Sequence, residues 1–162
     1  MDEKITASLL SFTFLFWGCT TRASVNEPLD QVLLDTLRKF EYVSDEDQYG
    51  EDRKISFAKQ VKEGKTFKGD CDDFAYTIRD LLKEKGHKVT TVIVRIPKIS
   101  GSKLHMVVKV DDKYMIDNRH PFVRTWEQGV KGSMYKELSI KELIRVLVQQ
   151  TVEKTQKQLR KQ

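Results

Sequence analysis

The chain has 162 residues, of which 39% are hydrophobic and 33% are charged, and it contains no internal repeats or low-complexity tracts. This length leaves room for one domain, and the composition is that of a soluble globular domain rather than a repeat or low-complexity protein. Residues 153–162 hold four Lys or Arg against one acid, a large part of the net charge of +5. No aromatic residues are interleaved with these charges, so the sequence predicts no nucleic-acid partner.

An apolar run begins at Ile5 and ends at Gly18, directly before Cys19. Its 14 residues are fewer than the roughly 20 that a transmembrane helix needs, but they suit the apolar core of an export signal. Gly18-Cys19 resembles the end of a bacterial lipobox, in which the cysteine is acylated after cleavage. We therefore predict that residues 1–19 are a signal peptide or a lipoprotein signal or anchor. The protein would be exported and periplasmic, anchored in the membrane through lipidation of Cys19.

The sequence has two cysteines, Cys19 and Cys71. In an exported chain they would either form one disulfide or serve separately. Because Cys19 lies at the edge of a segment that we expect to be removed or held at the membrane, we favour one lipid anchor and one functional thiol.

Residues 20–26 are a short polar linker, and the predicted domain spans residues 27–162. It should begin with a helix over residues 27–40, since proline at position 28 suits a first helical turn. Residues 44–52 are acidic and predict a loop, and residues 54–64 predict a second, weaker helix.

A third helix is expected to begin at Cys71 and to end before Gly86, because apolar residues recur there at three- and four-residue intervals. Asp70 suits the N-cap, and Asp72 and Asp73 suit the first turn, where the helix dipole favours negative charge. Cys71 would then lie where backbone N–H groups stabilise a thiolate. The alternative is an inert buried cysteine. Three aspartates oppose a thiolate unless a metal or a histidinium neutralises them.

After this helix the hydrophobic period changes from 3.6 to 2. Strands are expected over residues 88–97, 103–110 and 113–117, followed by an irregular stretch over 118–133. The last helix opens with a capping box from Ser139 to Glu142. Helices, then an antiparallel sheet, then a helix predict an α+β fold.

A nucleophilic cysteine needs a base and usually a third group that orients the base. Of the three histidines, His87 and His120 lie in expected loops, where a surface or structural role is the simpler interpretation. His105 lies within a strand, and Asp117 closes the next strand, where a carboxylate is normally unfavourable. His105 and Asp117 are therefore the candidates to work with Cys71.

The hairpin loop decides whether His105 and Asp117 share a face of the sheet. A three-residue connection such as Val110-Asp111-Asp112 would place them opposite each other, whereas a two-residue Asp111-Asp112 loop would point them to opposite faces. The sequence leaves both registers open. The chemistry favours the first, because Asp117 would then orient the imidazole. Cys71, packed against that face, would complete a Cys-His-Asp triad.

Three blocks occur in order: Gly69-Asp70-Cys71-Asp72-Asp73-Phe74-Ala75, His105-Met106-Val107-Val108 and Met115-Ile116-Asp117-Asn118. They resemble the bacterial transglutaminase-like cysteine proteinases, periplasmic enzymes of the LapG type that cleave surface adhesins. The resemblance implies a papain- or transglutaminase-like α+β fold, with the nucleophile at a helix N-terminus packed on a small antiparallel sheet and with a C-terminal helix. It also implies Cys71 as nucleophile, His105 as general base and acid, and Asp117 as the orienting acid. The short connections between the blocks indicate a compact member.

The resemblance further implies a calcium ion held by the residues that flank the nucleophile, Asp70 and Asp72. Carboxylate oxygens are suitable hard ligands, and a cation would offset the negative charge beside the thiolate. The alternative is that Asp70 only caps the helix and Asp72 only complements its dipole.

The predicted function is hydrolysis of a peptide or amide bond in an envelope or exported protein, through a thioester acyl-enzyme. One alternative is a transglutaminase-type acyl transferase that uses the same triad. Another is a non-catalytic envelope lipoprotein that keeps the fold and binds a protein or peptidoglycan partner. The expected partners are a protein substrate in the cell envelope and the membrane, reached through the lipid or N-terminal anchor.

Overall fold

The structure is a computed structural model that describes residues 27–97, 104–131 and 135–160. The predictions for residues 1–26, including lipidation of Cys19, lie outside the described residues. The helices are α1 (Glu27–Leu37), α2 (Asp45–Tyr49), α3 (Ala58–Lys62), α4 (Cys71–Glu84), α5 (Trp126–Lys131) and α6 (Ile140–Leu159). The strands are β1 (Phe40–Tyr42), β2 (Phe67–Gly69), β3 (Val89–Arg95), β4 (Leu104–Val110), β5 (Tyr114–Ile116), β6 (Arg124–Thr125) and β7 (Lys136–Glu137). Among the described residues, no helix is both long and apolar enough to span a membrane.

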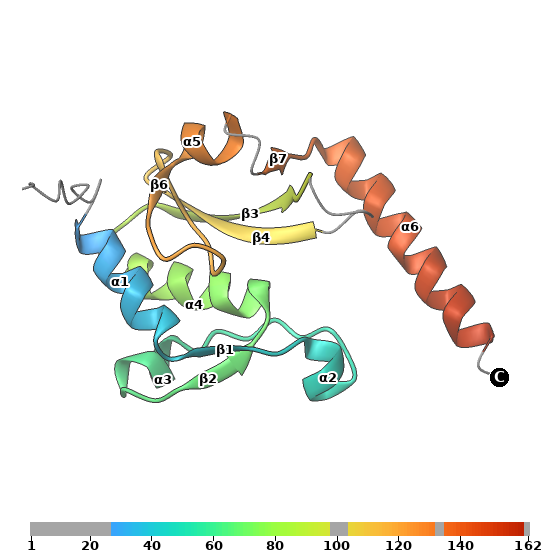
Figure 1. Ribbon diagram of the computed structural model, residues 1–162, viewed down its shortest axis with the longest axis horizontal. Helices are drawn as coiled ribbons and strands as arrows, with labels where there is room; N and C mark the ends of the chain where they lie inside the picture. The colour runs from blue at the N-terminus through green and yellow to red at the C-terminus, as the bar shows by residue number, and fades with distance from the viewer. Residues whose placement is uncertain (1–26, 98–103, 132–134, 161–162) are drawn as a thin grey trace, which may run out of the picture.

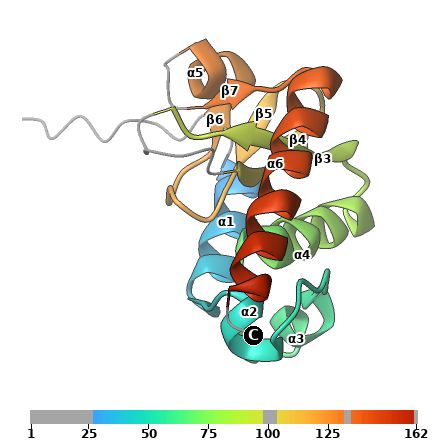
Figure 2. The ribbon, with the colours of Figure 1, turned by 90° about the vertical axis from the view of Figure 1, so that its right-hand side faces the viewer.

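Five strands form one antiparallel sheet in the order β6-β5-β4-β3-β7. Helix α4 lies against one face of this sheet, and a separate parallel pair, β1 and β2, lies on the far side of α4 (Figure 1). Helix α6 stands beside the end of the sheet (Figures 1 and 2). The predicted α+β fold, with a helix on a small antiparallel sheet and a C-terminal helix, is confirmed.

The larger hydrophobic core joins α4 to the sheet. It contains Phe74, Ile78 and Leu81 from α4 and Val108 and Val110 from β4, all nearly inaccessible to solvent. The spacing of these residues explains both elements, because the α4 positions share one helical face and the β4 positions share one face of the strand. This core fixes α4, and hence the start of α4, against the sheet.

A second core covers the opposite face of the sheet. It contains Val107, Met115 and Tyr135, with α5 packed against it. Since side chains alternate along a strand, His105 lies on this second face together with Val107. The expectation that the cysteine helix packs against the His105 face is therefore wrong: α4 covers the other face.

The β4–β5 hairpin has the register with an odd number of loop residues. Val110 pairs with Tyr114. Asp111 and Asp112 form the turn with φ angles of +50° and +55°, a left-handed conformation that aspartate tolerates better than most residues. Lys113 closes the turn, and its N–H donates to the Val110 carbonyl at 3.0 Å. It makes the loop three residues long, so that the number of loop residues is odd.

This register places His105 and Asp117 on the same face of the sheet, as the chemical argument favoured. They are not directly opposite, because Val108 pairs with Ile116 and the same register would set Asp117 opposite Val107. Asp117 instead follows β5 as a diagonal neighbour of His105.

The N-terminal third differs most from its sequence-based prediction. The first helix ends at Leu37, and Phe40 belongs to β1, which pairs with β2. The expected loop at 44–52 contains the short helix α2, whose N-cap is Ser44. Later in the chain, the stretch at 118–133 that was expected to be irregular contains β6 and α5.

The second helix forms only over α3 because the residues before it bond to side chains. The backbone N–H groups of Arg53, Ile55 and Phe57 donate to Asp45 (2.5 Å), Asp73 (2.7 Å) and Thr77 (2.9 Å). Backbone donors used in this way are not available to a regular helix. The segment is thereby attached to α2 and α4, close to the cysteine.

Candidate active site

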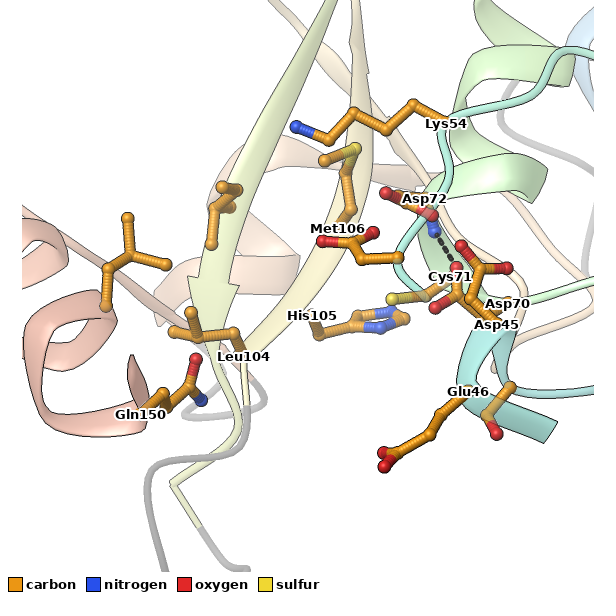
Figure 3. A pocket seen from close by; sticks show the side chains of 14 residues that line it. Asp45, Glu46, Lys54, Asp70, Cys71, Asp72, Leu104, His105, Met106 and Gln150 are labelled. Carbon is orange, nitrogen blue, oxygen red and sulfur yellow. Dashed lines mark hydrogen bonds between the residues drawn. The ribbon is translucent and has the colours of Figure 1, made fainter. Parts of the chain in front are cut away.

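Cys71 and His105 line one cavity of about 380 Å³ at the end of the sheet. Their side chains point toward one another in Figure 3. One wall of the cavity comes from α2 and the start of α4 and is acidic, with Asp45, Glu46 and Asp72 among its residues. The other wall comes from β3, β4 and α6.

A strand followed by a helix cap positions the cysteine. Gly69 ends β2, and Asp70 adopts an extended conformation as the N-cap of α4, its side chain accepting from the Asp72 N–H at 2.9 Å. Cys71 is consequently the first residue of α4. The backbone N–H of Met106 donates to its thiol. Because β5 has ended at Ile116, the thiol meets β4 where β5 no longer pairs with it.

The surroundings of Cys71 disfavour its thiolate. Burial, together with the charges of Asp70 and Asp72, raises the pKa of Cys71 to about 11, although the Met106 N–H acts in the opposite direction. A thiolate near neutral pH therefore requires that the proton move to an imidazolium or that a cation offset the carboxylates.

His105 is buried and faces Asp117. Its Nε2 lies 3.8 Å from Asp117 Oδ1, a separation longer than a hydrogen bond, and Nε2 has no hydrogen-bond partner among the described residues. Since Nε2 is directed at the carboxylate, Nδ1 is the nitrogen left to meet the thiol of Cys71.

Asp117 is held as a carboxylate although it is only 3% exposed. Burial opposes its charge, but His105, the backbone N–H of Arg119 and the nearby His120 together hold the pKa of Asp117 below its usual range. The Arg119 N–H donates to Oδ1 at 2.6 Å, and the Tyr135 hydroxyl donates to Oδ2 at 3.0 Å.

Tyr135 contacts both His105 and Asp117, and the sequence did not predict this role. Its ring stacks on His105 with the centroids 5.5 Å apart, while its hydroxyl holds Asp117. Burial and the charge of Asp117 raise the pKa of Tyr135 well above its usual range, so the hydroxyl remains a donor. Tyr135 follows an expected irregular stretch, and no periodic pattern there signals its role.

The other two histidines do not line the cavity. His87 Nδ1 lies 2.8 Å from a carboxylate oxygen of Asp111, on the turn side of the hairpin. His120 lies near the ring of Tyr135, and burial lowers its pKa.

A group of three carboxylates adjoins the cysteine. One oxygen each from Asp45, Asp70 and Asp73 lies within 4.8 Å of the others. Asp45 Oδ1 and Asp73 Oδ2 are buried without a hydrogen-bond partner, and a Cβ on Gly69 would lie 2.5 Å from Asp73 Oδ2. Burial, followed by the charges of Asp45 and Asp70, raises the pKa of Asp73 to about 6. Carboxylates that repel one another and include two buried oxygens without a hydrogen-bond partner fit a hard divalent cation such as Ca²⁺.

The sequence-based calcium prediction paired Asp70 with Asp72. The structure brings Asp70 together with Asp45 and Asp73, and the side chain of Asp72, which is not part of this group, also interacts with Asp70. Asp72 Oδ1 is buried without a partner, and burial, Asp70 and further acidic neighbours raise the pKa of Asp72 to about 8. The calcium site thus stays a prediction, with two ligand sets to distinguish.

A helix that begins with a cysteine and packs on an antiparallel sheet, with a histidine on one strand and an aspartate directly after the next, is compatible with a transglutaminase-like fold. The chain matches the family model of the bacterial transglutaminase-like cysteine proteinases (BTLCP) over residues 19–140. The protein belongs to this family. A search of curated proteins gave no match.

The ionised Asp117 gives a prediction for acid stability. Its pKa in the folded protein lies below the ordinary value of 3.8, so as the pH falls the unfolded chain takes up the proton first. This contribution to stability is present above about pH 4 and is lost as the pH falls through the folded-state pKa. Asp117→Asn should therefore lose free energy of unfolding less steeply than wild type between about pH 5 and pH 2.5, in urea titrations. Asp35→Asn, an equal charge change at an exposed site, should follow wild type. If the free energy of unfolding falls equally steeply with pH in Asp117→Asn and wild type, Asp117 does not have a lowered pKa in the folded protein.

Proposed function

We propose that this protein is a cysteine peptidase that hydrolyses a peptide or amide bond through Cys71, His105 and Asp117. The observation that carries the proposal is that Cys71 and His105 line one cavity while Asp117 lies behind the imidazole. The family description, cysteine proteinase, favours hydrolysis over acyl transfer.

In this reaction His105 Nδ1 takes the thiol proton, and the Cys71 sulfur attacks the carbonyl carbon of the substrate. Asp117 orients the ring and stabilises the imidazolium. The imidazolium then protonates the departing amine, which leaves a thioester on Cys71. His105 removes a proton from water, the hydroxide attacks the thioester, and the product carboxylate and the thiol are released.

The developing oxyanion needs a donor. We assign the backbone N–H of Cys71, because the first N–H groups of a helix have no intrahelical acceptor. The Met106 N–H is directed at the sulfur and contributes to holding the thiol.

A thiol-directed activity probe tests the triad. At neutral pH, Cys71→Ala should not be labelled, and His105→Ala should be labelled about 10²-fold more slowly than wild type, as expected for loss of a general base. His87→Ala is the matched control, since His87 pairs with Asp111 outside the cavity, and should label like wild type. Equal, slow labelling of wild type and His105→Ala would refute catalysis and favour the non-catalytic lipoprotein.

We further propose that Ca²⁺ binds Asp45, Asp70 and Asp73. The support is their clustering and the two orphaned buried oxygens. Bound calcium would supply positive charge that offsets the carboxylates beside Cys71.

At a calcium concentration about 100-fold above Kd, binding to the folded state alone adds about 2.7 kcal/mol and raises Tm by roughly 5–10 °C. Asp73→Asn should lose most of this shift in differential scanning calorimetry. Asp72→Asn should keep it if Asp45, Asp70 and Asp73 are the ligands, and should lose it if Asp70 and Asp72 are. No shift in wild type, or one unchanged in both variants, would exclude these carboxylates as the site.

We place the substrate among exported or envelope proteins, on the support of the apolar segment and Gly18-Cys19. Intact-mass spectrometry of the protein made in its native cells should give a chain that begins at Cys19 and carries a lipid. A mature chain that begins at Met1 without lipid would contradict both export by cleavage and lipidation.

A further inference from the structure

Helix α6 carries an apolar stripe on its surface. Ile144 is 56% exposed, Leu147 44% and Val148 58%, and the stripe continues at three- and four-residue intervals to Val152. The family match covers residues 19–140 and so ends where α6 begins. The stripe is therefore a feature of this chain beyond the part that it shares with the family model.

The fold holds α6 beside the cavity. Strand β7 pairs with the end of β3, and the β3 residues concerned, Val94 and Arg95, pair in turn with His105 and Leu104. A complete capping box at Ser139 then starts α6 two residues after β7. The start of α6 is thus tied, through two ladders, to the strand that carries the histidine.

Part of the stripe forms a wall of the cavity. Leu147 lines the cavity together with Ile93, Leu104 and Met106, the apolar residues that β3 and β4 contribute. In Figure 3 Leu104 and Gln150 lie on one side of His105 and the acidic residues lie on the other. The cavity therefore offers an apolar surface and an acidic surface on either side of His105.

We propose that Leu147, with Leu104, forms an apolar subsite that binds an apolar side chain of the polypeptide substrate beside the scissile bond. This inference rests on the proposed function for the identity of its substrate, a polypeptide. Binding at the subsite, however, does not require that the protein cleave the peptide. A volume of about 380 Å³ admits a few side chains and not a helix, which is about 10 Å across. Acidic side chains are disfavoured by the carboxylate wall. An aliphatic side chain is therefore the occupant that the cavity fits, rather than a second copy of α6.

The test uses short peptide amides that differ at one position, leucine or the near-isosteric asparagine, placed in turn at each of three central positions. Binding is measured by NMR titration on Cys71→Ala, which cannot react. At one position the leucine peptide should bind about tenfold more tightly, as expected for filling an apolar pocket. Adding Leu147→Asn should abolish this preference, and adding Leu147→Met should retain it.

Val152→Asn is the matched control, because Val152 belongs to the stripe but does not line the cavity. It should leave the preference unchanged. Equal binding of all peptides, or a preference that survives Leu147→Asn, would overturn the subsite. So would a wild-type dimer in analytical ultracentrifugation that Leu147→Asn and Val152→Asn both dissociate, since a second copy would then occupy the stripe. The two proposals can fail separately. If the peptides show the leucine preference but thiol labelling of the wild type does not depend on His105, the subsite is supported and the peptidase activity is refuted.

Discussion

The geometry of the site depends on a single residue in the β4–β5 hairpin. The turn at Asp111 and Asp112 alone would send His105 and Asp117 to opposite faces of the sheet, because a register shift of one residue reverses every side chain. Lys113 adds the residue that restores their common face. The early end of β5 has an equally direct effect. It leaves Asp117 free to turn behind the imidazole, and it leaves β4 unpaired by β5 at the position where the thiol approaches.

Negative charge around Cys71 is the unfavourable side of this arrangement. Asp70 is required as the cap that starts α4, and Asp73 is required as the acceptor that holds the Ile55 N–H. The charge of Asp70 opposes a thiolate at Cys71, as does the charge of Asp72 in the first turn, so the structural demands of the helix start conflict with the demands of the nucleophile. Transfer of the thiol proton to His105 and a cation beside the carboxylates are the two physical means that would resolve that conflict.

Long segments with a clear hydrophobic period were predictable from the sequence, whereas very short elements and contacts between distant residues were not. The apolar spacing in α4 and the alternation in β4 gave both elements to within about two residues, which placed Cys71 and His105 correctly on them. The parallel pair β1–β2 was missed because three-residue strands show no period. Asp45 was not connected with Asp70 because their proximity arises from tertiary contacts. The contacts of Tyr135 with His105 and Asp117, and the place of Leu147 beside the cavity, also arise from tertiary structure and have no local sequence signal.

The two hydrophobic cores on opposite faces of the sheet divide the site between them. The core beneath α4 fixes Cys71, while the core that contains Tyr135 fixes the ring of His105 and the carboxylate of Asp117. The thiol and the imidazole therefore meet at the boundary between two separately packed cores that share the backbones of β3, β4 and β5. Because interiors are close-packed, a change of volume in either core moves one group relative to the other. Residues far from the cavity, such as Ile78 and Met115, consequently belong to the positioning of the site as well as to the stability of the fold.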